Sequence, residues 1–132
     1  MPIFNGGRIG SNNDPFTGGD PNYSNVSLLL NGNGTNGSTT FTDSSSYGHT
    51  VTPVGNAQIS TAQSKFGDAS MYFDGSGYLA LPNDQTAFNF GTNDFTIESW
   101  IYYSGGAAGN IFSQRHAFDN NNTGMTWRTN QN

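Results

Sequence analysis

The chain has 132 residues, a formal net charge of −5 and no cysteine, and Asn, Gly, Ser and Thr together supply 64 of its residues. Strong helix formers are scarce, which disfavours a helical bundle. Four basic residues spread along the chain are too few to form a basic surface for the phosphates of a nucleic acid. The longest aliphatic run, Leu28–Leu30, cannot span a membrane, and the absence of cysteine removes disulfides and thiolate metal sites.

Aromatic residues nonetheless make up 14% of the chain. Each can bury roughly 150–250 Å², so they can supply a core that a disordered polar tract would lack. Residues 2–27 contain no apolar segment of the kind that a secretory signal needs. The composition therefore predicts one soluble, intracellularly made domain of the all-β class.

Residues 1–22 are expected to form an extended N-terminal arm that precedes a domain at residues 23–132. The arm is rich in Pro and Gly and shows no helix or strand period. Apolar side chains punctuate it, so two interpretations stay open: a disordered tail, or an arm that docks its aromatic residues on a partner or on its own domain. The residues expected to bind a partner are Phe4, Ile9, Phe16 and Tyr23.

From Asn25 onward, short strand signals alternate with turn residues. An Asn- and Gly-rich stretch at 31–37 predicts a loop with positive φ angles, and Gly75-Ser76-Gly77 predicts a hairpin between its flanking strands. The clearest strand is 95–103, where apolar residues alternate with polar and aromatic ones. The full set of expected strands is 26–30, 39–42, 51–54, 57–59, 70–74, 78–81, 95–103, 110–115 and 125–129, the last two joined by an Asn-rich turn at 119–124.

The order of these signals resembles a concanavalin A-like, laminin-G-like domain. The resemblance runs through Ser27–Leu30, Phe41–Ser45, Lys65-Phe-Gly67, Met71–Gly75 with Tyr78-Leu79, and Phe90-Gly91 with Asp94–Glu98 and Trp100. The resemblance covers about residues 20–129. Within this family, the chain is similar to the domains found in virion proteins of marine bacteriophages, cyanophages especially. The resemblance implies an antiparallel β-sandwich of the jelly-roll kind.

Two departures from that family bear on the expectation. Asn33 stands where relatives often carry an Asp, so a carboxylate is lost from the loop after the first strand. The family domain also usually runs some tens of residues further, which implies that the C-terminal strands of a complete jelly roll are missing here. An incomplete sandwich would expose strand edges and apolar surface.

Residue types argue against an enzyme. Glycosidases need two carboxylates flanking the scissile bond, but Glu98 is the only glutamate. If both lie on one strand, Asp94 is ~13 Å away from it, which is too far for either glycosidase geometry. His49 and His116 are the only histidines, and no Gly-x-Ser-x-Gly motif accompanies them. Both are expected in exposed loops.

No cofactor is expected, although calcium stays open because laminin-G-like domains often bind it. Calcium sites usually combine six to eight oxygen ligands, including carboxylates. The aspartates form no EF-hand run, and Asp43 and Asp74 are better explained as turn or Asx-cap residues. No metal ligands are therefore assigned.

The resemblance, the arm and the lack of catalytic groups predict a non-enzymatic structural protein of a phage virion. It would decorate or cement the capsid or tail, be held by its arm, and be made in the host cytoplasm. Its partners would be copies of itself and a larger virion protein, with neither nucleic acid nor membrane involved. The alternative is a lectin-like module that stacks host-surface glycan on exposed aromatic residues, against the plainer interpretation that those aromatics pack in the core or against a sheet. The candidates are Tyr47, Trp100, Tyr102 and Trp127.

Overall fold

The computed structural model describes residues 21–82, 85–105, 109–114 and 125–129. Phe4, Ile9, Phe16, His116 and the turn at 119–124 lie outside the described residues. The chain divides into two compact units, Met1–Ile101 and Tyr102–Asn132, which are considered separately below.

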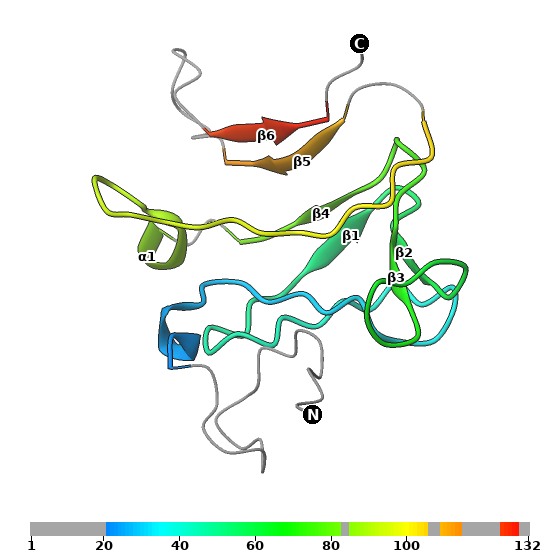
Figure 1. Cartoon of the computed structure of the whole chain (residues 1–132), viewed down its shortest axis with the longest axis horizontal. Coiled ribbons are helices and arrows are strands. Elements are labelled where there is room, and N and C mark those ends of the chain that lie inside the picture. The colour runs from blue at the N-terminus through cyan, green and yellow to red at the C-terminus, as the bar shows by residue number, and fades with distance from the viewer. Residues whose placement is uncertain (1–20, 83–84, 106–108, 115–124, 130–132) are drawn as a thin grey trace, which may run out of the picture. The chain divides into compact units, whose positions relative to one another are not determined.

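The described structure belongs to the all-β class, as the composition predicted. Its strands form three two-stranded antiparallel ladders (Figure 1). The helical elements among the described residues are short: a three-residue 3-10 turn, η1 (Tyr23–Asn25), and a four-residue helix, α1 (Gln85–Phe88). The strands are β1 (Thr52–Val54), β2 (Gln58–Ser60), β3 (Ser70–Tyr72), β4 (Tyr78–Ala80), β5 (Asn110–Ser113) and β6 (Thr126–Arg128).

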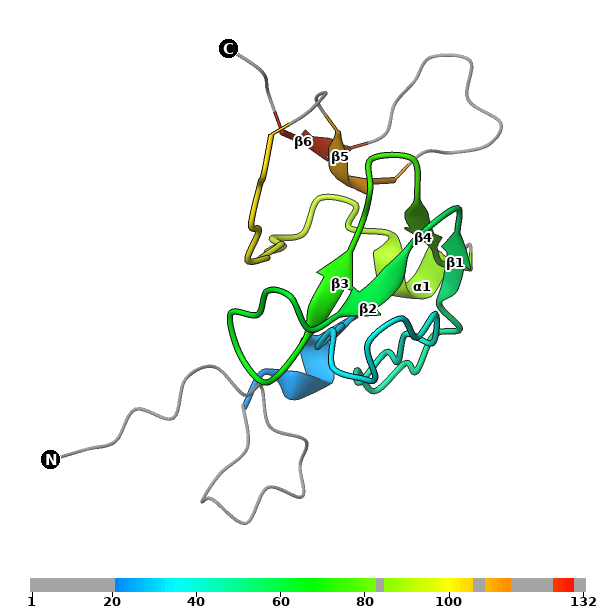
Figure 2. The same ribbon diagram turned by 90° about the vertical axis from the view of Figure 1, so that its right-hand side faces the viewer.

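The first unit is organised by one interrupted hairpin, residues 52–80. Strand β1 pairs with β4 and β2 pairs with β3, so residues 52–60 run antiparallel to 70–80 (Figure 2). The tip of this hairpin is the loop 61–69. The predicted hairpin between β3 and β4 across Gly75-Ser76-Gly77 is therefore wrong, because each of these strands pairs with an earlier one.

The Gly75-Ser76-Gly77 turn instead interrupts the long hairpin on one side. The Asp74 Oδ1 atom accepts bonds from the Ser76 N–H at 2.9 Å, the Ser76 hydroxyl at 2.8 Å and the Gly77 N–H at 3.2 Å. This Asx turn confirms the turn role expected of Asp74. Opposite it, Gly55 takes a φ of 68°, and a Cβ atom there would lie 3.0 Å from the Gly77 Cα. Two glycines thus let the two backbones touch where the ladder breaks.

The core of the first unit lies on one side of this hairpin. Ile59 is 1% exposed, and it packs with partly buried Leu30, Met71, Leu79 and Leu81. Burying an aliphatic side chain of this size stabilises by about 1.5–3 kcal/mol. Few side chains reach that depth in the described part of the chain. The buried members of the cluster are Phe41, Val51, Ala57, Ile59 and Ala69.

The glycine-rich loop at 31–37 has the positive φ angles that its sequence predicted, at Gly32, Gly34 and Gly37. It is attached to β2 by two backbone bonds, Gly37 N–H to the Ile59 carbonyl at 2.8 Å and Ile59 N–H to the Ser38 carbonyl at 2.7 Å. The predicted strands on either side of the loop are reduced to bridges: Leu30 with Asp43, and Thr42 with Thr50.

The predicted strand at 95–103 is wrong. No residue between 94 and 104 is assigned to a strand, and the segment runs as an open stretch of chain (Figure 1). Its sequence favours a strand, but strand structure also needs a partner for the backbone, and in the described part of the chain residues 94–101 form no backbone hydrogen bond.

In the second unit, β5 and β6 pair antiparallel, with a bulge between Asn110 and Phe112. Bonds from the Gln114 N–H to the Met125 carbonyl and from the Thr129 N–H to the Gly109 carbonyl, both 2.9 Å, extend the ladder at its two ends. The two expected strands are confirmed at Asn110–Ser113 and Thr126–Arg128.

Candidate functional site

Asp43 is a buried carboxylate of the first unit that accepts four hydrogen bonds. It is 8% exposed. Its Oδ1 accepts from the N–H groups of Leu29 at 3.0 Å and Ser45 at 2.9 Å. Its Oδ2 accepts from the Ser45 hydroxyl at 2.9 Å and the His49 N–H at 2.8 Å. One carboxylate thereby fixes three points of the backbone, which confirms the Asx-cap role that the sequence predicted.

These bonds also set the charge state of Asp43. Burial acts to raise the pKa of its carboxyl, because a charged group loses solvation. The N–H groups of Leu29, Ser45 and His49, together with the Ser45 hydroxyl, outweigh this effect and hold the pKa below its ordinary value. Asp43 is therefore a charged group whose two oxygens are already occupied by this chain, which suits a structural role better than a catalytic one.

A shallow cavity of about 220 Å³ lies beside Asp43 in the first unit. Its lining combines apolar side chains with amide and hydroxyl groups. The Asn31 amide donates to the Ser44 hydroxyl at 3.2 Å across part of this lining. Ligand pockets usually measure about 300–1,000 Å³, so this cavity is small for one. Its lining residues are Leu30, Asn31, Gly32, Asn33, Phe41, Thr42, Ser44, Ile59 and Met71.

A first aromatic group surrounds His49. The Tyr47 ring stacks on the His49 ring with centroids 5.5 Å apart. The Phe88 ring of α1 is tilted relative to the His49 ring, and their centroids are 5.1 Å apart. Tyr47 is 43% exposed, whereas His49 is half-buried. The expectation of an exposed loop His at position 49 is therefore wrong, because these neighbouring rings cover it.

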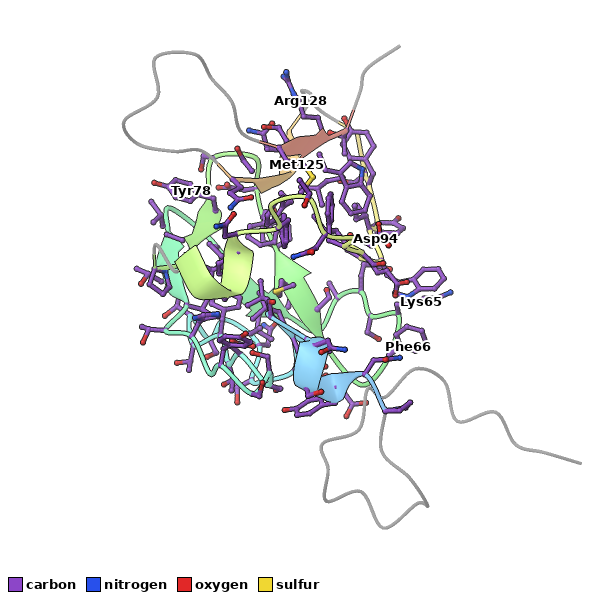
Figure 3. The ribbon with its side chains drawn as sticks, turned by 90° about the vertical axis from the view of Figure 1, so that its left-hand side faces the viewer. Lys65, Phe66, Tyr78, Asp94, Met125 and Arg128 are labelled. Atoms are coloured by element: carbon purple, nitrogen blue, oxygen red, sulfur yellow. The ribbon has the colours of Figure 1, made fainter. Side chains whose placement is uncertain are left out.

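A second aromatic group is built on Trp100. The Phe66 ring meets the indole edge-on at 5.9 Å, and the Lys65 ammonium lies 4.5 Å from the indole centroid. Lys65 and Phe66 project from the loop between β2 and β3 (Figure 3). Trp100 is still 72% exposed, so much of its surface remains open to solvent. A cation over an exposed indole is worth about 0.5–1 kcal/mol.

The chain around Trp100 is the most exposed apolar part of the first unit, and we call residues 94–101 the open segment. Phe95 is 49% exposed and Ile101 48%. Phe95 is held by stacking on Phe90 at 4.6 Å. Within the described part of the chain, the backbone of the open segment forms no hydrogen bond. The segment is thus anchored at Phe95 and Trp100 by rings, with its main chain unpaired between them.

The predicted glycan-binding residues are divided between the two units. Tyr47 and Trp100 belong to the two separate aromatic groups, and Tyr102 and Trp127 lie in the second unit. Trp100 and Tyr102 are 72% and 73% exposed. These two side chains are therefore not core aromatics, whereas their interpretation as sheet-packing aromatics stays a prediction.

Tyr23 is the one predicted arm residue within the described part of the chain. It starts η1, is half-buried, and its hydroxyl donates to the Ser44 carbonyl. Tyr23 is thus attached to the loop that Asp43 organises.

Acidic groups with catalytic or metal-binding potential are dispersed. Asp94 and Glu98 are both exposed, as expected for solvated residues. Across the described ranges, no three His, Asp or Glu side chains gather as a metal site would require. The described helices include none that is long and apolar enough to cross a membrane.

The Lys65–Trp100 contact was missed by sequence reasoning. Its partners lie 35 positions apart, and neither position carries a motif that would link them. The nearest signal was that Lys65-Phe-Gly67 and Trp100 belong to the same family resemblance. Comparison with known proteins adds no relative: no family model, no curated protein and no solved structure matches this chain.

Proposed function

We propose that this chain is a non-enzymatic structural protein of a bacteriophage virion, a laminin-G-like β-sandwich that decorates or cements the capsid or tail. The proposal joins the family resemblance of residues 20–129 to the β-rich structure. It treats the three separate ladders as parts of two sheets that are completed in the assembled particle.

The main support for this proposal is the exposed apolar surface and unpaired backbone of the open segment. It presents exposed Trp100 and Ile101 on a backbone that lacks partners in the described part of the chain. Unpaired strand-forming edges promote association, and native proteins cover or blunt them. Contiguous exposed apolar surface commonly marks a protein interface. A structural subunit that meets neighbours in a particle has a use for such a surface.

The acidic residues support a structural role as well. Asp43 and Asp74, whose carboxyl pKa values are both lowered, each accept hydrogen bonds that hold a backbone turn, at Ser45 and at Ser76. A general acid needs the opposite environment, one that raises the pKa toward neutrality. Asp43 and Asp74 are therefore turn-forming groups.

The arm is the part of the proposal that mutation tests directly. Particles of the phage that encodes this chain would be purified and their proteins quantified by mass spectrometry. Deletion of residues 1–19, or the triple change of Phe4, Ile9 and Phe16 to Ala, should reduce the occupancy of the protein by at least about tenfold, since buried aromatic anchors dominate interfaces. A matched change of Asn5, Asn12 and Asn13 to Ala should leave occupancy intact.

Absence of this protein from purified particles would overturn the proposal. Unchanged occupancy after the deletion would reject only the role of the arm as the anchor. A cryo-EM reconstruction of the same particles would show whether the subunit contains the two packed sheets of a sandwich.

A lectin-like role in host recognition is the second candidate, and the exposure of Trp100 favours it. Sugars stack on open aromatic faces, and the Trp100 indole is open on much of its surface. A glycan array probed with the full chain, with and without calcium, should then give a saturable signal that Trp100→Ala abolishes and that deletion of residues 1–19 preserves. An array without signal under both conditions removes this candidate.

A further inference from the structure

The open segment has residue types that favour a β-strand, but its backbone has no hydrogen-bonding partner in the described part of the chain. Ile97, Trp100 and Ile101 are of the β-branched and aromatic types that strands favour. Glu98 and Ser99 are exposed, as are Trp100 and Ile101. A strand needs a neighbour about 4.7–4.9 Å away to satisfy its backbone. The question is which chain supplies that neighbour.

Symmetry limits how the segment can pair with a second copy. A twofold axis perpendicular to an antiparallel ribbon keeps every residue on its own face, so the axis passes through one residue pair. Within residues 97–101 the three central choices are Glu98, Ser99 and Trp100. Each choice determines which side chains stand directly opposite one another.

Charge decides among these three registers. An axis at Glu98 sets two carboxylates directly opposite, which is destabilising. An axis at Trp100 sets two indoles opposite, each with a Lys65 ammonium 4.5 Å from its centroid, and so brings two cations together. An axis at Ser99 sets each Trp100, with its Lys65, opposite the Glu98 of the other copy. Only this register places unlike charges together.

The Ser99 register also matches the apolar side chains. Ile97 stands opposite Ile101 of the other copy, and two small serines meet at the axis. Cross-strand pairs of β-branched residues contribute roughly 0.2–1 kcal/mol each. Lys65 is the only lysine of the chain and Glu98 the only glutamate, so this pairing would use both.

We propose that residues 97–101 pair antiparallel with the same residues of a second copy of this chain, with the twofold axis at Ser99 and with Lys65 facing Glu98 across the interface. The inference rests on the proposed structural function and names a second copy as the partner of the open segment. It concerns the first unit alone.

Cross-linking tests the register, and the natural absence of cysteine leaves no background thiols. In this register, Ser99→Cys places two thiols within the Cα separation of about 4.4–6.8 Å that a disulfide requires. Glu98→Cys places its two thiols diagonally, at roughly 7–8 Å or more between Cα atoms, which is outside that range. Under mild oxidation of the full-length chain, Ser99→Cys should form covalent dimers at least about tenfold faster than Glu98→Cys.

A charge exchange tests the contact between Lys65 and Glu98. Sedimentation of the full chain should show concentration-dependent dimers, and Lys65→Glu or Glu98→Lys should each weaken them by at least about tenfold. The double variant restores the opposite charges and should recover the affinity to within about threefold, as a double-mutant cycle for a direct contact requires. Asp94→Lys makes the same change of charge outside residues 97–101 and should have little effect.

Three outcomes would overturn the inference: a monomer at all concentrations, equal cross-linking of the two cysteine variants, or a double variant no better than the singles. Cross-linking of Ser99→Cys particles to a different virion protein would also overturn it, while leaving the proposed function standing. Absence of the protein from particles, with the dimer register intact, would reject the proposed function instead.

Discussion

The carboxylate of Asp43 accepts a hydrogen bond from the backbone N–H of Leu29, 3.0 Å away and 14 positions earlier in the chain. This bond joins the predicted strand 26–30 to the residue that follows the predicted strand 39–42, where the backbone contributes the isolated bridge of Leu30 with Asp43 and one bond from the Ser44 N–H to the Leu29 carbonyl. The Asp43 side chain helps to connect the two segments, a role that a ladder of backbone hydrogen bonds has in a regular sheet. The same carboxylate holds the turn at Ser45 and the backbone at His49.

Asp43→Asn should destabilise the fold by about 2 kcal/mol, as expected when hydrogen bonds to a buried charged group are lost. Both oxygens of Asp43 accept bonds, so either orientation of the amide sets an NH₂ group against backbone donors. Urea unfolding followed by circular dichroism would measure the loss. Asp74→Asn is the matched control and should cost less, because Asp74 is exposed and water can replace its lost hydrogen bonds, whereas Asp43 is buried.

Stability should fall in acid. The pKa values of Asp43 and Asp74 are lowered in the folded chain, so the folded state binds fewer protons than the unfolded state. The free energy of unfolding therefore rises with pH through this range. Their contribution is fully present above the unfolded pKa of about 3.9 and is lost as the pH falls through the folded values. Urea midpoints measured from about pH 2 to pH 6 would give this slope, and Asp43→Asn should flatten it.

Ile59→Ala should destabilise the first unit by about 2–5 kcal/mol, since it removes buried aliphatic groups and leaves empty volume in the core. Ile59 is 1% exposed and sits at the centre of the cluster. Ile101→Ala removes the same atoms from a side chain that is 48% exposed. It should change the unfolding free energy of dilute protein by less than about 0.5 kcal/mol. Equal effects of the two changes would contradict this description of the core.

Gly77→Ala should cost about 1–3 kcal/mol by overpacking. A Cβ atom at position 77 would lie 2.8 Å from the Ala57 backbone nitrogen and 3.0 Å from the Val54 carbonyl oxygen, and backbone atoms cannot swing aside. Thermal unfolding would show a lowered midpoint. Gly109→Ala is the control, because a Cβ atom there meets nothing within 4 Å; it should leave the midpoint nearly unchanged.

Local chemistry was readable from the sequence, whereas strand pairing was not. The Asp43 and Asp74 turns and the positive φ angles of the 31–37 loop follow from residue types that act on their immediate neighbours. The hairpin predicted across Gly75-Ser76-Gly77 failed because a glycine turn can end a strand pair or merely interrupt it. Contacts of Leu79 with Pro53 and of Met71 with Ile59 decided the matter, and these partners lie 12 or more positions apart.

The candidate surface shows the same division. The alternation of apolar and polar residues at 95–103 predicted a strand, and the preference of those residues for extended backbone is intrinsic. Whether a strand forms depends on a partner, and in the described structure the open segment has none. The contact of Lys65 with Trp100 likewise arises only because the interrupted hairpin carries the loop 61–69 to the open segment.

The sequence by itself determined the fold class of this protein. Scarce helix formers, abundant turn residues and short aromatic runs left a β structure with many turns, because those preferences act within a few residues. The tertiary structure decided which strands pair, which aromatics are buried and which are exposed. Trp100 illustrates the reason: its side chain is apolar enough for a core, but burial depends on how much chain folds over a position, and Trp100 stays 72% exposed although Lys65 and Phe66 contact its ring.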